Sequence, residues 1–253
     1  GKSDNPNYIS FQWSSFESPY IDDEFLREQE RSLPEAIFKQ EFWAEFTDAG
    51  QDVFKNLNEV CILNSFEQHN NSKTYIGVDV GISNDYTAIC VINDQGRVLY
   101  VSRYNGKPTT EISVDVIKIC RQYKVVGGYI ETNGIGRGVF DQVHASFRKI
   151  KPFNTTQDNK TQMVRKLIED IETRTVELPS ENLFPYLFRE MSMYTYKLSA
   201  NGKMSFTHPP GHHDDVVDSL LLANEARHTI VTKGIYVGNT GGDLSPTFGR
   251  PVR

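Results

Sequence analysis

The sequence predicts an α/β fold in which helices lie on the faces of a mixed β-sheet. Three apolar segments follow one another between residues 75 and 104, and each has the length and composition of a β-strand. A helical segment, a fourth apolar strand and then several helical patterns come after them. Adjacent strands followed by alternating helices are typical of a sheet that is covered by helices.

Local patterns place the expected elements in chain order. Strands are expected at residues 75–80, 86–92, 97–104 and 125–130. Helices are expected at residues 109–123, 136–147, 160–172 and 213–227. The dipeptide Asn201-Gly202 is the strongest short-range turn signal of the chain and predicts an auxiliary β-hairpin over residues 195–206.

We expect the chain to have three parts. Residues 1–73 are predicted to form a helical linker segment, with one helix beginning at Asp22-Asp23 and another running from Leu33-Pro34-Glu35 through Phe46. The α/β domain is expected to span residues 74–232. Residues 233–253 are rich in glycine and proline and are predicted to form a loosely ordered tail.

Length and composition exclude several classes of protein. The 253 residues can form one sizeable domain and an appendage. No apolar run approaches the roughly 18 residues of a membrane span, so no membrane partner is expected. The chain starts at Gly1 without a signal peptide, and we expect it to be a fragment of a longer protein. Three scattered cysteines, Cys61, Cys90 and Cys120, favour a reducing compartment over a disulfide framework or a zinc site.

The net charge of −6 is unusual for a nucleic-acid-binding domain. An acidic metal site and an acidic N-terminal segment can together produce such a charge. A DNA-binding function would therefore need a local basic face.

Carboxylates occupy three positions at which they need a partner. Asp79 and Glu131 each end an apolar strand, where a carboxylate must be solvated, paired or bound to a metal. In the last predicted helix, Asp215 and Asp218 are spaced i, i+3 and Asp214 and Asp218 are spaced i, i+4, so all three can point to one side. The opposite side of this helix is apolar enough to pack on a sheet.

Converging carboxylates repel one another unless a cation holds them together. Oxygen ligands select hard ions, so the pattern favours Mg²⁺ or Mn²⁺ over zinc. Two such ions at roughly 3.5–4 Å from each other would support phosphodiester hydrolysis. The pattern thus indicates a metal-dependent enzyme that acts on nucleic acid.

Each of these residues also has a structural interpretation. Asp79 could be a turn aspartate, Glu131 could pair with Arg137, and Asp214 could cap the last helix. His213 and its neighbour His212 could be loop residues or could orient water or a phosphate. Asp85 is more typical of a turn or supporting residue than of a ligand.

Four segments resemble one known family, the large terminase subunits of phage DNA-packaging motors. Three of them resemble the nuclease half of those subunits: the motifs from Val78 to Ala88, Glu131-Thr132-Asn133-Gly134 and the run from His213 to Leu220. Upstream, residues 33–54 are similar to the segment that leaves the terminase ATPase domain. The resemblance covers roughly residues 20–228. The last helix also resembles that of Holliday-junction resolvases.

The resemblance implies a ribonuclease H-like fold and endonucleolytic cutting of concatemeric double-stranded DNA during viral genome packaging. It implies catalytic metal ligands at Asp79, Glu131 and Asp215, with Asp214 and Asp218 as further candidates, and two Mg²⁺ or Mn²⁺ ions as cofactors. The implied partners are an ATPase domain of the same parent chain, a portal protein and a small terminase subunit. The implied location is the host cytoplasm, in the assembling virus particle.

Basic residues near these motifs are the candidates for DNA contacts. They are Arg137, Lys160, Arg165, Lys166, Lys197 and Lys203. The hairpin that carries the last two leads directly into the acidic helix, which would place them close to the metals.

Two other classes of protein remain open. The strand from Ile76 to Gly81 also resembles the first phosphate loop of sugar-kinase and chaperone-type ATPases, but Gly241-Gly242, the only late Gly-Gly pair, lies in the tail. A module that keeps the fold for docking without catalysis is the other alternative, and the intact acidic set argues against it.

Overall fold

A five-stranded mixed sheet lies at the centre of the computed structural model, which describes residues 12–32, 35–45, 53–66, 72–81, 85–198, 204–209 and 211–235. Its strands are β1 (Thr74–Asp79), β2 (Thr87–Asn93), β3 (Val98–Tyr104), β4 (Gly127–Glu131) and β5 (Ile150–Phe153). Their order across the sheet is β3-β2-β1-β4-β5. The pairs β1–β2 and β2–β3 are antiparallel, whereas β1–β4 and β4–β5 are parallel.

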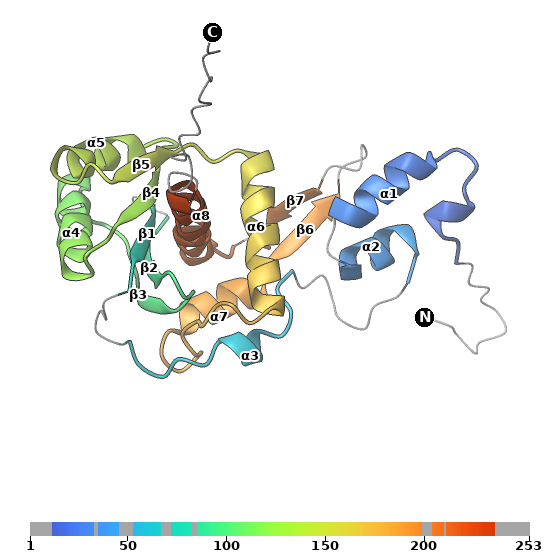
Figure 1. Ribbon diagram of the computed structural model, residues 1–253, viewed down its shortest axis with the longest axis horizontal. Helices are drawn as coiled ribbons and strands as arrows, with labels where there is room; N and C mark the ends of the chain where they lie inside the picture. Colours follow the sequence, from blue (N-terminus) through green and yellow to red (C-terminus); the bar gives the residue numbers. More distant parts are fainter. Residues whose placement is uncertain are drawn as a thin grey trace, which may run out of the picture.

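Helices cover both faces of this sheet (Figure 1). In the α/β domain they are α4 (Thr109–Gln122), α5 (Gly136–Ser146), α6 (Gln157–Glu172), α7 (Pro185–Ser192) and α8 (Asp215–Ile235). On one face, α4 and α5 bury Ile76 and Val78 of β1. On the other face, α8 packs against β1, β2 and β4, and Tyr75 belongs to that second core. The sheet therefore has an apolar core on each side, as expected for an α/β fold.

The contact between α8 and β1 is unusually close. A Cβ atom on Gly77 would lie 2.1 Å from the carbonyl oxygen of Ser219 and 2.3 Å from the backbone nitrogen of Ala223. Only glycine leaves room for this approach. Because Gly77 precedes Asp79 by two residues, the same crossing brings the start of α8 to the end of β1.

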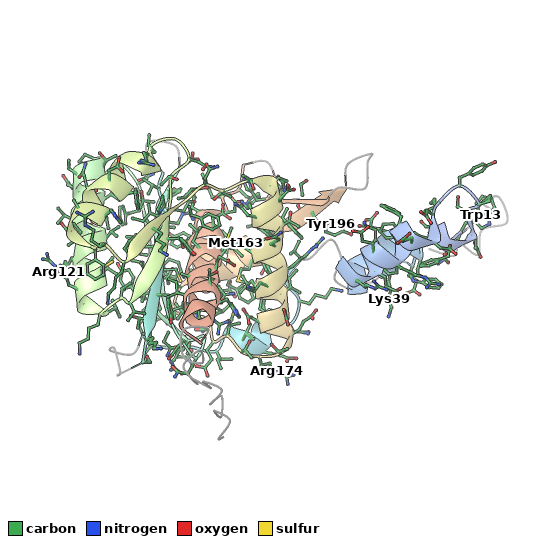
Figure 2. The ribbon with its side chains drawn as sticks, turned by 45° about the horizontal axis from the view of Figure 1, so that its top comes forward. Trp13, Lys39, Arg121, Met163, Arg174 and Tyr196 are labelled. Atoms are coloured by element: carbon green, nitrogen blue, oxygen red, sulfur yellow. The ribbon has the colours of Figure 1, made fainter. Side chains whose placement is uncertain are left out.

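Helix α6 lies beside α8 on the side away from the sheet, and Met163 is buried between them (Figures 1 and 2). Thr156 caps the start of α6 by accepting a hydrogen bond from the Asn159 backbone, in a complete capping box. The two helices run in the same direction, since Lys160 contacts Asp218 at their beginnings and Asp170 contacts His228 further along.

The predicted hairpin is present as β6 (Thr195–Leu198) and β7 (Met204–Thr207), which form a separate two-stranded sheet. Figure 1 shows it between α6 and the N-terminal helices α1 (Asp23–Ser32) and α2 (Glu35–Phe42), which follow a short 3-10 helix, η1 (Ser15–Glu17). The hydroxyl of Tyr196 donates a hydrogen bond of 3.1 Å to Glu41 (Figure 2 shows Tyr196 directed toward these helices). The hairpin thus contacts the N-terminal segment.

Part of the predicted linker segment packs on the domain. The short helix α3 (Leu57–Val60) buries both of its end residues, and Leu63 forms a β-bridge with Pro179. Arg174, at the end of α6, is paired with Glu59 of α3. Residues 67–71 of the polar stretch lie outside the described residues, as does the tail beyond residue 235.

The expected elements are present, with local differences. Strand β5 was not expected, because it is only four residues long and contains Pro152, which suits the edge of a sheet. Helix α7 was not expected from the sequence either. Helix α8 extends to Ile235, eight residues beyond its predicted end at Arg227. Arg227 itself lies within the helix and forms an ion pair with Asp170. Among the described residues, no helix has the length and apolar character needed to span a membrane.

Candidate metal centre

The pleat of the sheet directs the first two predicted ligands toward α8. In β1, Ile76 and Val78 face α4 and α5, so the alternate residues, including Asp79, face α8. Val78 pairs with Ile130 of the parallel strand β4, and Glu131 therefore follows beside Asp79 at the same end of the sheet. The two carboxyl groups are close enough for Glu131 to raise the pKa of Asp79. Two strand ends thus deliver two acids to one point.

The first turns of α8 add further carboxylates to this point. Asp218 has the strongest charge interaction with Asp79, and Asp215 has a weaker one. Burial, Asp218 and Glu131 together raise the pKa of Asp79 well above its ordinary value. Burial also raises the pKa of Asp218, against the opposing charge of Lys160. The structure therefore groups Asp218, more closely than Asp215, with the two strand-end acids.

Asp215 belongs to a second group, formed with Asp85 and His213. One potential ligand atom from each of the three residues lies within 4.8 Å of the others. Asp85 is exposed on the loop that precedes β2, and His213 precedes α8. The ring of Tyr86 meets the His213 ring edge-on, with 5.1 Å between their centroids, and so limits its orientation.

The donor atoms of the two groups fit a hard divalent cation. The buried atoms Oδ2 of Asp215 and Oδ1 of Asp218 have no hydrogen-bond partner. Buried carboxylate oxygens without partners are costly, and a cation would satisfy them. Carboxylates with at most one imidazole suit Mg²⁺ or Mn²⁺. The residues present therefore fit such an ion. Within the described part of the chain, Asp85, His213 and Asp215 are the three that form a compact ligand group.

Glu190 and Arg103 hold the start of α8. Glu190, on α7, accepts hydrogen bonds from the backbone N–H groups of Val216 and Val217, at 2.9 and 3.1 Å. Arg103, at the end of β3, lies 3.5 Å from Glu190 and 4.0 Å from Asp215. Glu190 thus provides the side-chain cap that sequence analysis considered for Asp214.

Two tyrosines enclose the Arg103 guanidinium. Its central carbon lies 3.6 Å from the centroid of the Tyr86 ring and 5.0 Å from that of Tyr186. The Tyr86 ring also contacts the ring of His213, and Tyr186 is on the same helix as Glu190. The charge of Arg103 is therefore fixed at the edge of the cluster.

The basic residues predicted to contact DNA have different environments. Lys160 is directed into the acidic cluster, with its Nζ 3.0 Å from Asp214 and 2.7 Å from Asp218. Arg137 pairs with Asp141 on its own helix, not with Glu131. The remaining candidates are the half-buried Arg165, Lys166 at 3.9 Å from Glu225, Lys197 in β6, and Lys203, which lies outside the described residues.

The sequence alone points to neither Arg103 nor Glu190, and it favours a turn or supporting role for Asp85. For Arg103 a signal was present: it pairs with Ala88, which pairs in turn with Asp79, so all three lie in one row across the sheet. Knowing the strand register would have placed Arg103 beside the acids. For Glu190 the sequence contains no comparable signal, because no strand pairing determines which residues of α7 lie against α8.

The sheet order, the two flanking helical layers and the acids at the ends of β1, β4 and α8 define a ribonuclease H-like domain with a cation-binding type of site. Residues 76–226 match the terminase RNaseH-like domain family, and the chain belongs to that family. The match includes all of the predicted acidic residues. It favours a terminase-type domain over the sugar-kinase and chaperone-type ATPases.

Individual relatives agree with this assignment. The chain is 24% identical over 230 residues to the large terminase subunits of Thermus virus P23-45 and Thermus phage G20c. The match covers 87% of this chain and 47% of each relative, so the chain spans about half the length of these curated relatives.

Solved structures share the fold. The large terminase nuclease of phage G20c with bound magnesium has a TM-score of 0.61 at 23% identity, covering 70% of this chain and 98% of that one. The large terminase nuclease domain of Thermus phage P74-26 has a TM-score of 0.56 at 23% identity, covering 68% of this chain and 93% of that one. Other forms of the G20c nuclease hold cobalt or zinc.

Proposed function

We propose that this chain is the endonuclease domain of a large terminase subunit and that it cuts concatemeric double-stranded DNA during viral genome packaging. The observation that carries the proposal is the convergence of strand-end and helix-borne carboxylates in a chain of the terminase RNaseH-like family. Magnesium in a G20c nuclease of the same fold supports a dependence on divalent ions.

In this proposal each residue of the site has a definite task. Asp79, Glu131 and Asp218 would hold one divalent ion, and Asp85, His213 and Asp215 would hold another. Two bound Mg²⁺ or Mn²⁺ ions would supply an activated water and a counter-charge for the leaving oxygen. Asp214 stays at the edge of the cluster, paired with Lys160.

The remaining parts of the proposal concern partners. A longer parent chain with an ATPase domain is supported by the coverage of the Thermus relatives. Docking to a portal protein and a small terminase subunit in the host cytoplasm follows from the family role. Arg137, Lys197 and Lys203 are proposed to contact the DNA backbone, because they lie on or next to elements that lead to the acids.

Cutting of supercoiled plasmid tests the proposal. The wild-type chain should nick or linearise the plasmid with Mn²⁺ or Mg²⁺ and should stop when excess EDTA is added. Asp79→Asn should reduce cutting by more than about a hundredfold, because even the partners of metal ligands contribute 10–100-fold.

Asp115→Asn is the matched control. Asp115 is on α4, on the opposite face of the sheet, where it pairs with Lys107, and its replacement should leave cutting unchanged. Cutting that persisted in excess EDTA, or in the Asp79→Asn variant, would contradict the proposal. A folded, metal-binding chain that never cuts would favour a docking module instead.

A further inference from the structure

Lys160 lies in an unusual place for a lysine on a helix. It is in the first turn of α6, where the helix dipole disfavours a positive charge. Its side chain is only 17% exposed and reaches α8 instead of solvent. Something other than helix stability must therefore compensate for its position.

The compensation comes from two carboxylates of the acidic cluster. The Nζ atom lies 3.0 Å from Oδ2 of Asp214 and 2.7 Å from Oδ2 of Asp218. Burial by itself lowers the pKa of the ammonium, but the charges of Asp218 and Asp214 outweigh it and leave the pKa raised. Lys160 is thus a full positive charge inside the cluster.

The contact with Lys160 gives the two oxygens of the Asp218 carboxylate different environments. Oδ2 is bound by Lys160, whereas Oδ1 is buried and has no hydrogen-bond partner. The free oxygen belongs to the carboxylate that interacts most strongly with Asp79. One oxygen is therefore held by a cation of the protein, and the other remains for a cation from solution.

We propose that Lys160 is a built-in cation of the acidic cluster, which holds Asp214 and Asp218 in place when no divalent ion is bound and weakens the binding of that ion. Two effects follow from its charge. Without a divalent ion, it offsets the repulsion among carboxylates. With a divalent ion nearby, it competes for the same oxygens and repels the ion. The second effect rests on the proposed function, and the first does not.

The test compares Lys160→Met with wild type by thermal unfolding in EDTA and during Mn²⁺ titration, without DNA. In EDTA, the variant should unfold several degrees lower. It should bind Mn²⁺ on the order of tenfold more tightly, because one competing charge is gone. Its stabilisation at subsaturating Mn²⁺ should accordingly exceed that of wild type.

Lys166→Met is the matched control, since it makes the same substitution on the same helix. Lys166 lies 3.9 Å from Glu225, away from the cluster, and its side chain is 37% exposed. The control should change neither the unfolding temperature in EDTA nor the affinity for Mn²⁺ appreciably.

Equal or weaker Mn²⁺ binding by Lys160→Met would overturn the proposal, and so would an unchanged unfolding temperature in EDTA. If the variant does not fold in EDTA, Lys160→Met combined with Asp214→Asn decides. Recovered folding supports the built-in cation, because one repelling carboxylate has been removed, and a lack of recovery contradicts it. If wild type binds no Mn²⁺, the proposed function fails, while the EDTA comparison still tests the role of Lys160 in holding the acids.

Discussion

Two buried carboxylates outside the acidic cluster fix the position of α8. Near its start, Glu190 accepts hydrogen bonds from two backbone N–H groups and lies close to Arg103. Further along, Asp170 accepts a hydrogen bond of 2.7 Å from Asn224 and pairs with Arg227 at 2.9 Å. Neither residue is needed as a metal ligand. Their shared effect is to hold the helix that carries Asp215 and Asp218.

Replacing Glu190 should therefore destabilise the protein at a distance from any ligand. Glu190→Ala leaves two N–H groups without their acceptor and removes one of the two carboxylates beside Arg103. We therefore expect a loss of about 3 kcal/mol in the free energy of unfolding. Glu190→Gln keeps an acceptor oxygen and should lose less. Chemical denaturation in EDTA measures both.

Glu177→Gln provides the control for that measurement. Glu177 pairs with Arg97 before the start of β3, and its side chain is 41% exposed. Exposed ion pairs contribute about 0–1 kcal/mol, so the change should be small. If Glu190→Ala were no more destabilising than this control, the capping role would be disproved.

At the scale of secondary structure, the site depends on how closely one helix crosses one strand. Residues Ser219 and Ala223 of α8 pass over Gly77 of β1 at backbone contact distance. This crossing sets the separation between the start of α8 and Asp79. A shift of α8 would therefore change packing and the acidic cluster together.

Gly77→Ala is expected to show both effects. Its Cβ would meet backbone atoms of α8 at 2.1 and 2.3 Å, so the helix must move. We expect a loss of about 1–3 kcal/mol in the free energy of unfolding, with a smaller stabilisation by Mn²⁺. Thermal unfolding with and without the ion measures both quantities.

Gly138→Ala is the matched control. Gly138 is inside α5, and a Cβ there would meet nothing within 4 Å. Alanine should stabilise this helix by roughly 0.5–1 kcal/mol. Equal behaviour of the two alanine variants would show that the close crossing is unimportant.

At the scale of the whole molecule, carboxylates contribute to the pH dependence of stability with opposite signs. Burial raises the pKa of Asp79 and Asp215. Burial alone would also raise the pKa of Asp170, but hydrogen bonds from His228 and Asn224 and the charge of Arg227 outweigh it and lower the pKa below the ordinary 3.8. A lowered pKa in the folded state means that the Asp170 carboxylate stabilises the fold above pH 3.8, and that this contribution is lost as the pH falls further.

Asp170→Asn isolates that contribution. At pH 7 the variant should be less stable than wild type by about 3 kcal/mol, because the buried Arg227 loses its charged partner. Below pH 3.8 the difference should shrink, because the wild-type carboxyl takes up a proton in the unfolded state while it stays ionised in the fold. Urea denaturation between pH 7 and pH 3 follows the difference. A difference that stayed constant over this range would rule out the ionised Asp170 as its source.

Much of the fold could be predicted from the sequence, because the spacing of the apolar residues indicates where the strands and helices lie. Four of the five sheet strands and α8 follow from such patterns, and the hairpin follows from the turn signal Asn201-Gly202. Asp79 and Glu131 stand out as acids at the ends of apolar strands. The direction of Lys160 could not be predicted, because it depends on α6 packing beside α8. For the same reason, the closeness of Asp85 to His213 could not be predicted, since residues distant in sequence meet there.

The distance along the chain between the acids also affects biosynthesis. Asp218 is synthesised 139 residues after Asp79, as the difference between the two residue numbers shows. While the ribosome is still synthesising the segment before α8, β1 and β4 can pair, but the helix that completes the site does not yet exist. A nascent chain therefore carries no complete acidic cluster until α8 has left the ribosomal exit tunnel. This order of synthesis delays assembly of the site until the domain is nearly finished.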